Sequence, residues 1–263
     1  MRDRNTTIIK TVTKQIVFYA VLIAVWQILF YLCVSVFKLW KPYAFPSPAG
    51  VWRSLLLLIK QHALFNAVYF SLKRAFIGYV ISVIIGSVTG FLLVWIKGFS
   101  DTAKPLILGI QTLPSVCWVP FAILWFGLKE SAIIFVVIMG SAFSITIAVE
   151  TAIRNVNPIY IKAAKTMGAK GFNLYFKVIL PAGLPSLISG MKQGWSFAWR
   201  SLMAGEVMTA TIGLGQALTM GRDLADINRV MLIILIIIML GVLIEKAFFG
   251  IAENNILKKM GLA

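Results

Sequence analysis

The chain has 263 residues, of which 60% are apolar and 13% charged, and its mean hydropathy is +0.90. A soluble globular domain carries roughly 25% charged residues, so the composition excludes that class and indicates an integral membrane protein in a lipid bilayer. The net charge of +16 raises the question of nucleic acid. The basic residues lie scattered between apolar runs, however, so we expect no nucleic-acid partner and interpret them as an orientation signal.

Residue types that bind metals or carry out catalysis are scarce. The two cysteines lie in apolar runs and there is one histidine, so we expect no disulfide framework, no metal site and no cofactor. The sequence has no G-x-x-x-x-G-K-[ST] loop and therefore cannot cradle the phosphates of ATP itself. A membrane-embedded enzyme would need clustered His, Cys or carboxylates, and the chain has nine acidic residues in all. We expect this chain not to be an enzyme.

Six apolar stretches are long enough for membrane-spanning helices, which need about 20 mainly apolar residues each. The first is too long for a signal-peptide core and lacks a small-x-small cleavage site, so we expect it to be retained. Pro114 and Pro120 interrupt the third, which predicts a kinked or broken helix. The fold predicted is an all-α membrane protein with about six transmembrane helices. The stretches are 16–37, 75–96, 105–127, 132–150, 187–209 and 230–251.

The basic residues favour an orientation with both termini in the cytoplasm. The predicted outer loops after the third and fifth spans then carry only Lys129, Arg222 and Arg229. The stretch 38–74 does not fit this orientation, because it places six basic residues on the outer side. The predicted cytoplasmic segments hold Arg2, Arg4, Lys10, Lys14, Lys97, Lys104, Arg154, Lys162, Lys165, Lys170, Lys177, Lys258 and Lys259.

Two further patterns concern organisation. The stretch 38–74 has three prolines and then a moderately amphipathic run at 51–62, which predicts an external turn and a short interfacial helix. We therefore expect an N-terminal part, residues 1–66, and a core, residues 67–263. In the second span small residues recur every four positions and form one stripe, which we interpret as a helix-packing surface. They are Gly78, Ser82, Gly86 and Gly90.

The internal segment 151–185 is predicted to be cytoplasmic and folded. Asn157 and Pro158 form a helix start, and a helix at 159–167 can end at Gly168. A second helical segment at 172–180 is expected to stop near Pro181. Small and apolar residues amid lysines suit docking into a partner's groove. A helix lying on anionic lipid is the alternative.

The spacing Ala163-Ala164, Gly168, Val178, Leu180-Pro181 resembles the EAA loop of binding-protein-dependent ABC permeases. In that family the helix of this loop, the coupling helix, fits a cleft of a cytoplasmic ATPase. The resemblance implies a type I ABC importer transmembrane domain, and Lys162 stands where the motif has glutamate. The coupling residues that it implies are Lys162, Ala163, Ala164, Met167, Gly168, Leu180 and Pro181.

Other motifs look like the nitrate, sulfonate and taurine branch of this family. The resemblance covers about the last 220 residues and implies a multi-pass protein of the bacterial inner membrane that transports a small, anionic solute. It also implies a permease homodimer, cytoplasmic ATPase subunits that hydrolyse ATP, and an extracytoplasmic solute-binding protein. The motifs are Phe45-Pro46-Ser47-Pro48, Ser71-Leu72-Lys73-Arg74, Leu113-Pro114, Pro120, Leu124-Trp125-Phe126-Gly127, Gly190, Trp199, Glu206 and Gly213-Leu214-Gly215.

The fifth span carries charges at intervals of four. A charge at mid-bilayer costs about 2.5–3.5 kcal/mol on insertion scales, so it usually faces a water-filled path or a partner. One interpretation is that a basic stripe lines a path for anions. The alternative is structural: Arg200 is neutralised by Glu206 or Glu150, and Lys192 extends its charged end to the membrane surface. The tryptophans then pack in the core. The candidate path residues are Lys192, Trp195, Ser196, Trp199, Arg200 and Glu206.

A secondary transporter driven by an ion gradient is the alternative function. It predicts inverted repeats with broken helices at matching positions in two halves of the chain. Pro114 and Pro120 both lie in one span, and no clear counterpart occurs near the C-terminus. The sequence therefore favours the importer.

Overall fold

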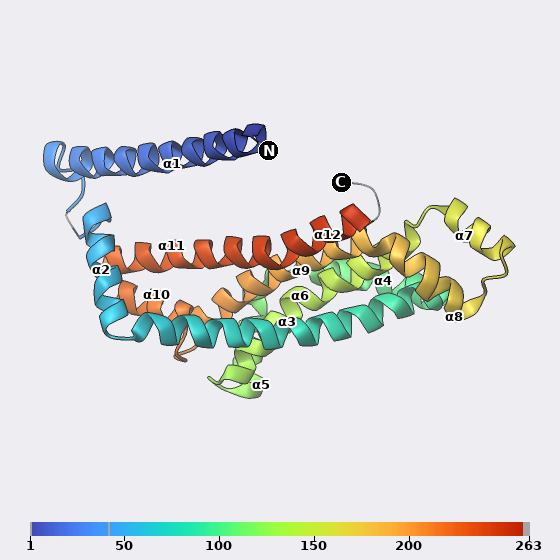
Figure 1. The fold of residues 1–263 in the computed structure, drawn as a ribbon. Coiled ribbons are helices and arrows are strands. Elements are labelled where there is room, and N and C mark those ends of the chain that lie inside the picture. The colour runs from blue at the N-terminus through green and yellow to red at the C-terminus, as the bar shows by residue number, and fades with distance from the viewer. Residues whose placement is uncertain (1, 42, 260–263) are drawn as a thin grey trace. The chain divides into compact units, whose positions relative to one another are not determined.

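The computed structural model describes residues 2–41 and 43–259, and every regular element in these ranges is helical. The all-α fold expected from the sequence is confirmed. Three π-helical segments, Tyr31–Val36, Tyr175–Ile179 and Glu245–Gly250, and the 3₁₀ segment Ser115–Trp118 adjoin the α-helices. The α-helices (Figure 1) are α1 (Arg2–Phe30), α2 (Pro48–Lys60), α3 (Ala63–Trp95), α4 (Lys97–Gln111), α5 (Val119–Phe126), α6 (Glu130–Arg154), α7 (Pro158–Thr166), α8 (Gly171–Leu174), α9 (Leu180–Met208), α10 (Leu214–Asp223), α11 (Ile227–Ile244) and α12 (Ile251–Lys259).

Among the described residues, five helical stretches are long and apolar enough to cross a membrane. A bent pair, Gly98–Gln111 and Ser115–Phe126, meets at 98° and brings the number to six if it counts as one span. The predicted number of spans and the broken third span are confirmed. The five stretches are Thr13–Val36, Ala63–Trp95, Glu130–Arg154, Gly171–Met208 and Ile227–Ile256.

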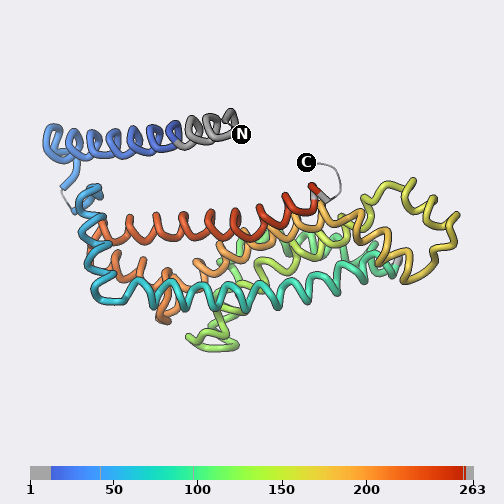
Figure 2. The backbone as a smooth tube through the Cα atoms, in the orientation of Figure 1, coloured from blue at the N-terminus to red at the C-terminus, as the bar shows by residue number. Residues whose placement is uncertain are grey.

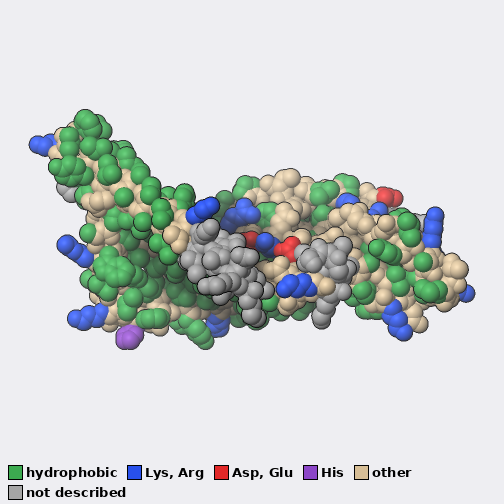
Figure 3. All heavy atoms as spheres, turned by 45° about the horizontal axis from the view of Figure 1, so that its top comes forward, with side chains coloured by type: hydrophobic (Ala, Val, Ile, Leu, Met, Phe, Trp, Pro, Cys, Tyr) green, Lys and Arg blue, Asp and Glu red, His purple; other side chains and the backbone are tan. Residues whose placement is uncertain are grey.

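Large hydrophobic side chains are exposed along these helices, for example Phe18, Ile84 and Leu243. Figure 3 shows such side chains over much of the face that it draws, with Lys and Arg at scattered points. Apolar patches of this extent mark surfaces that are covered by another apolar phase. A lipid bilayer supplies that phase.

The two prolines of the third span act differently. Pro114 lies in the break itself, with an extended backbone at ψ 135°. Pro120 lies in the first turn of α5, where the missing N–H has no helical partner to lose. The prediction that Pro120 also interrupts the span is therefore wrong.

The chain divides into two compact units, Met1–Phe65 with Ala217–Ile236 and Asn66–Gln216 with Ile237–Ala263. In the first unit the turn before α2 is held by side chains. Trp26 Nε1 donates to the Pro46 carbonyl at 3.0 Å, and the Ser47 N–H donates to Asn228 Oδ1 at 2.9 Å. Ser47 Oγ accepts from the Gly50 N–H at 3.0 Å and caps α2.

In the second unit, the small-residue stripe of α3 packs on α6. A Cβ at Gly86 would lie 2.8 Å from the carbonyl oxygen of Ala142, and one at Gly90 would lie 2.6 Å from that of Thr146. Only glycine allows the two backbones this close approach. The predicted packing role is confirmed, and the partner is α6, which also packs along α9.

The expected helix stop near Pro181 is wrong. Figure 2 traces the chain from α8 into α9, and Gly171–Met208 forms one helical stretch of 38 residues. The π-helical segment Tyr175–Ile179 directly precedes the proline, and the Leu180 N–H bonds to the Tyr175 carbonyl, five residues back. This wider turn absorbs the proline ring, which in an ordinary α-turn would clash with the carbonyl four residues earlier.

Candidate functional site

The segment between α6 and α9 folds around a small core of its own. The core consists of Val156, Ala164, Leu174 and Ile179, all buried. Asn157 starts α7, because its Oδ1 accepts from the Ile159 N–H at 3.0 Å. The predicted short helix with an Asn157 cap is confirmed.

Glycines close this loop. Gly168 follows α7 with φ +87° and Gly171 begins α8 with φ +53°, a backbone region that L side chains rarely adopt. The predicted end of the helix at Gly168 is confirmed. We name the segment Asn155–Ile179 the docking loop.

The predicted ATPase-coupling residues fall into three groups in the structure. Met167 is 83% exposed at the end of α7, and Lys162, Ala163 and Gly168 are exposed with it. Ala164 is only 3% exposed and belongs to the core of the docking loop. Leu180 and Pro181 lie in the first turn of α9.

Sequence reasoning missed other exposed apolar side chains of the docking loop. They share a position outside the loop core, and Phe172 and Phe176 stack with ring centroids 6.2 Å apart. The sequence feature that could have identified these side chains is the presence of large apolar residues in a segment that was expected to be exposed to water. They are Ile159, Tyr160, Phe172 and Phe176.

The candidate path residues of α9 point in different directions. Trp195 and Trp199 are buried and stack at 6.2 Å, as the core-packing alternative predicts. Lys192 Nζ lies 3.2 Å from Glu245 Oε1, so it has an ion-pair partner. Arg200 is exposed, and its Nε donates to the Ser196 carbonyl at 3.1 Å.

The expected neutralisation of Arg200 by Glu206 or Glu150 is wrong within this chain. Both carboxylates are buried and have other partners, Arg74 for Glu206 and Lys104 with Arg154 for Glu150. The guanidinium of Arg200 lies over the ring of Phe197 instead, 4.6 Å from its centroid. Arg200 therefore lies on an exposed face of α9 without an ion-pair partner among the described residues.

Glu206 lies at the centre of a buried cluster that gathers three of the sequence motifs. Arg74 Nη1 donates to Glu206 Oε1 at 2.9 Å, and the Ser71 hydroxyl donates to Oε2 at 2.7 Å. The Gly215 N–H donates to Oε2 at 3.0 Å. A Cβ at Gly213 would lie 2.5 Å from the carboxyl carbon, so glycine is required there. We name Ser71, Arg74, Glu206 and Gly213–Gly215 the buried charge cluster.

A second buried carboxylate ties α4 to α6. Glu150 Oε1 lies 2.9 Å from Lys104 Nζ and 2.7 Å from Arg154 Nε. Arg154 Nη2 also donates to Ser100 Oγ at 2.7 Å. Since Arg154 is the last residue of α6, these pairs fix the helix end from which the docking loop departs.

A polar cavity of about 580 Å³ lies between α4, α6, α9 and α12. Sequence reasoning missed this cavity. It considered charged residues along one helix, whereas the cavity is lined mainly by hydroxyl and amide side chains that come from four separate helices. Ser186, Ser189 and Gln193 are spaced by three and four residues on α9, and Arg200 lies two turns further along the same stripe. The polar side chains that line the cavity are Gln111, Ser144, Thr151, Ser186, Ser189, Gln193 and Glu253.

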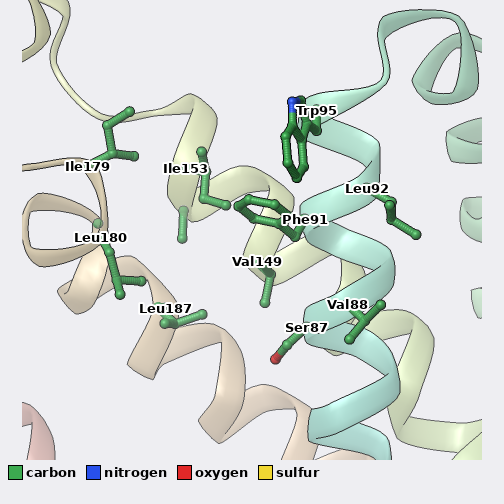
Figure 4. Close-up of a pocket in the computed structure, with 12 residues that line it drawn as sticks. Ser87, Val88, Phe91, Leu92, Trp95, Val149, Ile153, Ile179, Leu180 and Leu187 are labelled. Carbon is green, nitrogen blue, oxygen red and sulfur yellow. The ribbon is translucent and has the colours of Figure 1, made fainter. Parts of the chain in front are cut away.

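A second cavity of about 390 Å³ lies between α3, α6 and α9 and is apolar. In Figure 4 Phe91, Val149 and Leu187 face it from the three helices, and Ser87 brings the single oxygen among the labelled side chains. Such a lining suits hydrocarbon and offers an ionic solute no partner. Among the described residues no group of three His, Cys, Asp or Glu side chains could hold a metal ion.

These features define a class of protein: a polytopic helical membrane protein with a folded loop between two of its spans. The family model of the binding-protein-dependent transport system inner membrane component matches residues 78–256. The chain belongs to this family and is the transmembrane permease subunit of an ABC importer.

Relatives and solved structures agree with this family. The putative aliphatic sulfonates transport permease protein SsuC of Escherichia coli strain K12 is 32% identical over 227 residues, 85% of this chain and 83% of that protein. The taurine transport system permease protein TauC of the same strain is 27% identical over 215 residues, 78% of this chain and 75% of that protein. Inward-facing MetNI methionine ABC transporter has the same fold, with TM-score 0.64 and 22% identity over 74% of this chain and 96% of that one.

Proposed function

We propose that this permease forms, as a homodimer with cytoplasmic termini, the path of a small organic anion of the sulfonate type. A separate cytoplasmic ATPase would drive it, and an extracytoplasmic binding protein would deliver the solute. The relatives named for aliphatic sulfonates and taurine support the solute class. The observation that carries the proposal is the docking loop, which folds on its own core and leaves Met167 almost fully exposed.

The docking loop is built to receive a partner and to pass on its movement. Its core of four buried residues keeps α7 in place, so the exposed apolar side chains form a preformed surface for a groove in the ATPase. The loop continues directly into α6 at one end and α9 at the other. These two helices carry most of the polar cavity, so a push on α7 would shift the cavity walls between two states.

The position of Arg200 supports the proposal that the solute is an anion. This residue is exposed, and in the described part of the chain no carboxylate lies within ion-pair distance of it. A cation without a counter-ion in a membrane-spanning helix is costly unless it faces water or an anion. Arg200 would lower the electrostatic barrier to the passage of an anion. Because water and the Phe197 ring also stabilise the guanidinium charge, Arg200 would not bind the anion so tightly that it is trapped.

Replacing Met167 by glutamate is expected to abolish recovery of the ATPase with the purified permease. The carboxylate would have to enter an apolar groove, which costs several kcal/mol for an unpaired charge. Purification of the tagged chain from its host in mild detergent, with quantification of the copurified ATPase, is the measurement. Met167→Leu, which stays apolar, should retain the ATPase. Equal recovery with both variants would overturn the docking role, and solute uptake on an ion gradient without ATP would favour a secondary transporter.

Replacing Arg200 by glutamine is expected to lower uptake of a sulfonate about tenfold, the effect of about 1.4 kcal/mol on the barrier. Recovery of the ATPase should stay unchanged, because Arg200 is no part of the docking loop. Arg222→Gln is the matched control, since Arg222 is exposed and pairs with its neighbour Asp223. Loss of uptake and of the ATPase together would contradict a path role for Arg200.

A further inference from the structure

The apolar cavity between α3, α6 and α9 opens on the outer surface of these helices. Three of its lining residues, Val88, Trp95 and Leu180, are 57%, 61% and 40% exposed. Along α3 the lining extends from residue 87 to residue 95, about 12 Å at 1.5 Å per residue. The hydrocarbon of one leaflet is about 15 Å thick, half of a bilayer core. The length and the apolar lining of the cavity therefore suit one acyl chain of a lipid.

Aromatic rings surround the end of the cavity at the last turn of α3. Trp95 packs edge-on against Phe91 and Phe172, with ring centroids 5.3 and 6.1 Å apart. Phe172 stacks on Phe176, and both of these rings are exposed. The apolar run of α3 ends one residue beyond Trp95, so the rings lie where hydrocarbon meets the lipid headgroups, a level at which tryptophan is enriched. We name Phe91, Trp95, Phe172 and Phe176 the aromatic rim.

The cavity lies below this rim. In Figure 4 the nitrogen of Trp95 is at the end of the ring that points away from Ser87 and Leu187. The indole thus presents its donor on the headgroup side and its apolar body to the cavity. A lipid bound here has an apolar place for its chain and a polar one for its headgroup.

Lysines without neighbouring carboxylates adjoin the aromatic rim. Lys177 follows Phe176 directly, Lys170 precedes Phe172 by two positions, and both lysines are exposed. The whole docking loop contains no Asp or Glu. Basic pockets between transmembrane helices at the membrane surface bind anionic headgroups. The charge beside the cavity is therefore complementary to a phosphate that carries no cation of its own.

We propose that this cavity binds one anionic phospholipid, with an acyl chain along residues 87–95 and its phosphate at Lys170 and Lys177. The lipid joins α3 to the segment 171–179, through which the docking loop enters α9. The inference goes beyond the proposed function, because it requires neither a solute nor the ATPase. Met167 on α7 is no part of the cavity lining, so the lipid and the ATPase do not compete for it.

The test compares phosphatidylglycerol with phosphatidylcholine of the same acyl chains. Each lipid is titrated into the purified, delipidated permease in detergent, and native mass spectrometry counts the bound molecules. We expect one saturable phosphatidylglycerol site and about 25-fold weaker phosphatidylcholine, because each of two lysines contributes about fivefold to binding of an anionic headgroup. Lys170→Gln with Lys177→Gln should remove this advantage and leave phosphatidylcholine unchanged. Lys41→Gln with Lys60→Gln, two exposed lysines outside the docking loop, is the matched control and should keep the advantage.

Substitutions at Ser87 test the place of the acyl chain. Ser87→Phe puts a ring into the cavity and should abolish the phosphatidylglycerol site, whereas Ser87→Ala leaves the space open and should retain it. Leu187→Trp fills the same cavity from α9 and gives the same test if Ser87→Phe does not fold. Glycerol 3-phosphate, which has the phosphate without the chains, should not displace the lipid.

Four outcomes overturn the inference. The first is equal binding of the two lipids, which would show only the general lipid shell of a membrane protein. The second is an advantage of phosphatidylglycerol that survives removal of Lys170 and Lys177. The third is binding that a filled cavity leaves unchanged. The fourth is displacement of the lipid by glycerol 3-phosphate, which would show a site for free phosphate esters.

Discussion

Replacing Arg74 by alanine is expected to destabilise the folded permease by about 3–5 kcal/mol, because it leaves the buried carboxylate of Glu206 without its cationic partner. The side chain of Arg74 is 2% exposed and that of Glu206 is fully buried. Arg74 also donates to the Ile212 carbonyl at 2.7 Å and to Glu130 at 3.0 Å, so three partners lose a charged donor together. Thermal unfolding of the purified chain in detergent, with its yield, is the measurement.

Lys73→Ala is the matched control for this prediction. Lys73 is the neighbouring residue, its side chain is 44% exposed, and it approaches Glu130 only to 3.7 Å. An exposed pair of this kind contributes about 0–1 kcal/mol. Equal destabilisation by the two variants would show that the buried pair is not the cause.

A double variant separates two effects of Arg74→Ala: the unpaired buried charge of Glu206 and the loss of packing by the arginine side chain. Arg74→Met with Glu206→Leu removes both charges and keeps similar volumes, and such replacements are often neutral for a buried ion pair. We expect partial recovery only, because Ser71 and the Gly215 N–H also lose the carboxylate as their acceptor. A double variant no more stable than Arg74→Ala alone would contradict this account.

The sequence predicted those features that local patterns determine. Continuous apolar runs predicted the spans, and the pair Asn157 and Pro158 with Gly168 predicted the helix of the docking loop. Both rest on residues within one or two helical turns. The break at Pro114 is likewise a local effect of the proline on its own helix.

Features that depend on distant residues could not be predicted in this way. Glu206 finds its partner Arg74 132 positions earlier in the chain, and no spacing on α9 points to it. The polar cavity combines side chains from four helices, which become neighbours only in the folded bundle. At Pro181 the local rule itself failed, because a π-turn upstream accommodates the ring and lets the helix continue.

The burial of Ala164 leads to the second prediction with a large effect. Replacing it by aspartate is expected to unfold the docking loop and abolish recovery of the ATPase, because the charge would lie among Val156, Leu174 and Ile179. An unpaired carboxylate in such a core costs several kcal/mol. Limited proteolysis between residues 151 and 185 measures the folding of the loop, and copurification measures docking.

Ala163 supplies the matched control, since it is the preceding residue of α7 and is exposed. Ala163→Asp should leave the loop as resistant to protease as in the wild type, whatever it does to recovery of the ATPase. Faster cleavage in Ala164→Asp alone would show that Ala164 serves docking through the fold of the loop. If Ala164→Asp loses the ATPase while its loop stays resistant, Ala164 contacts the partner directly, and the loop must open when the two proteins meet.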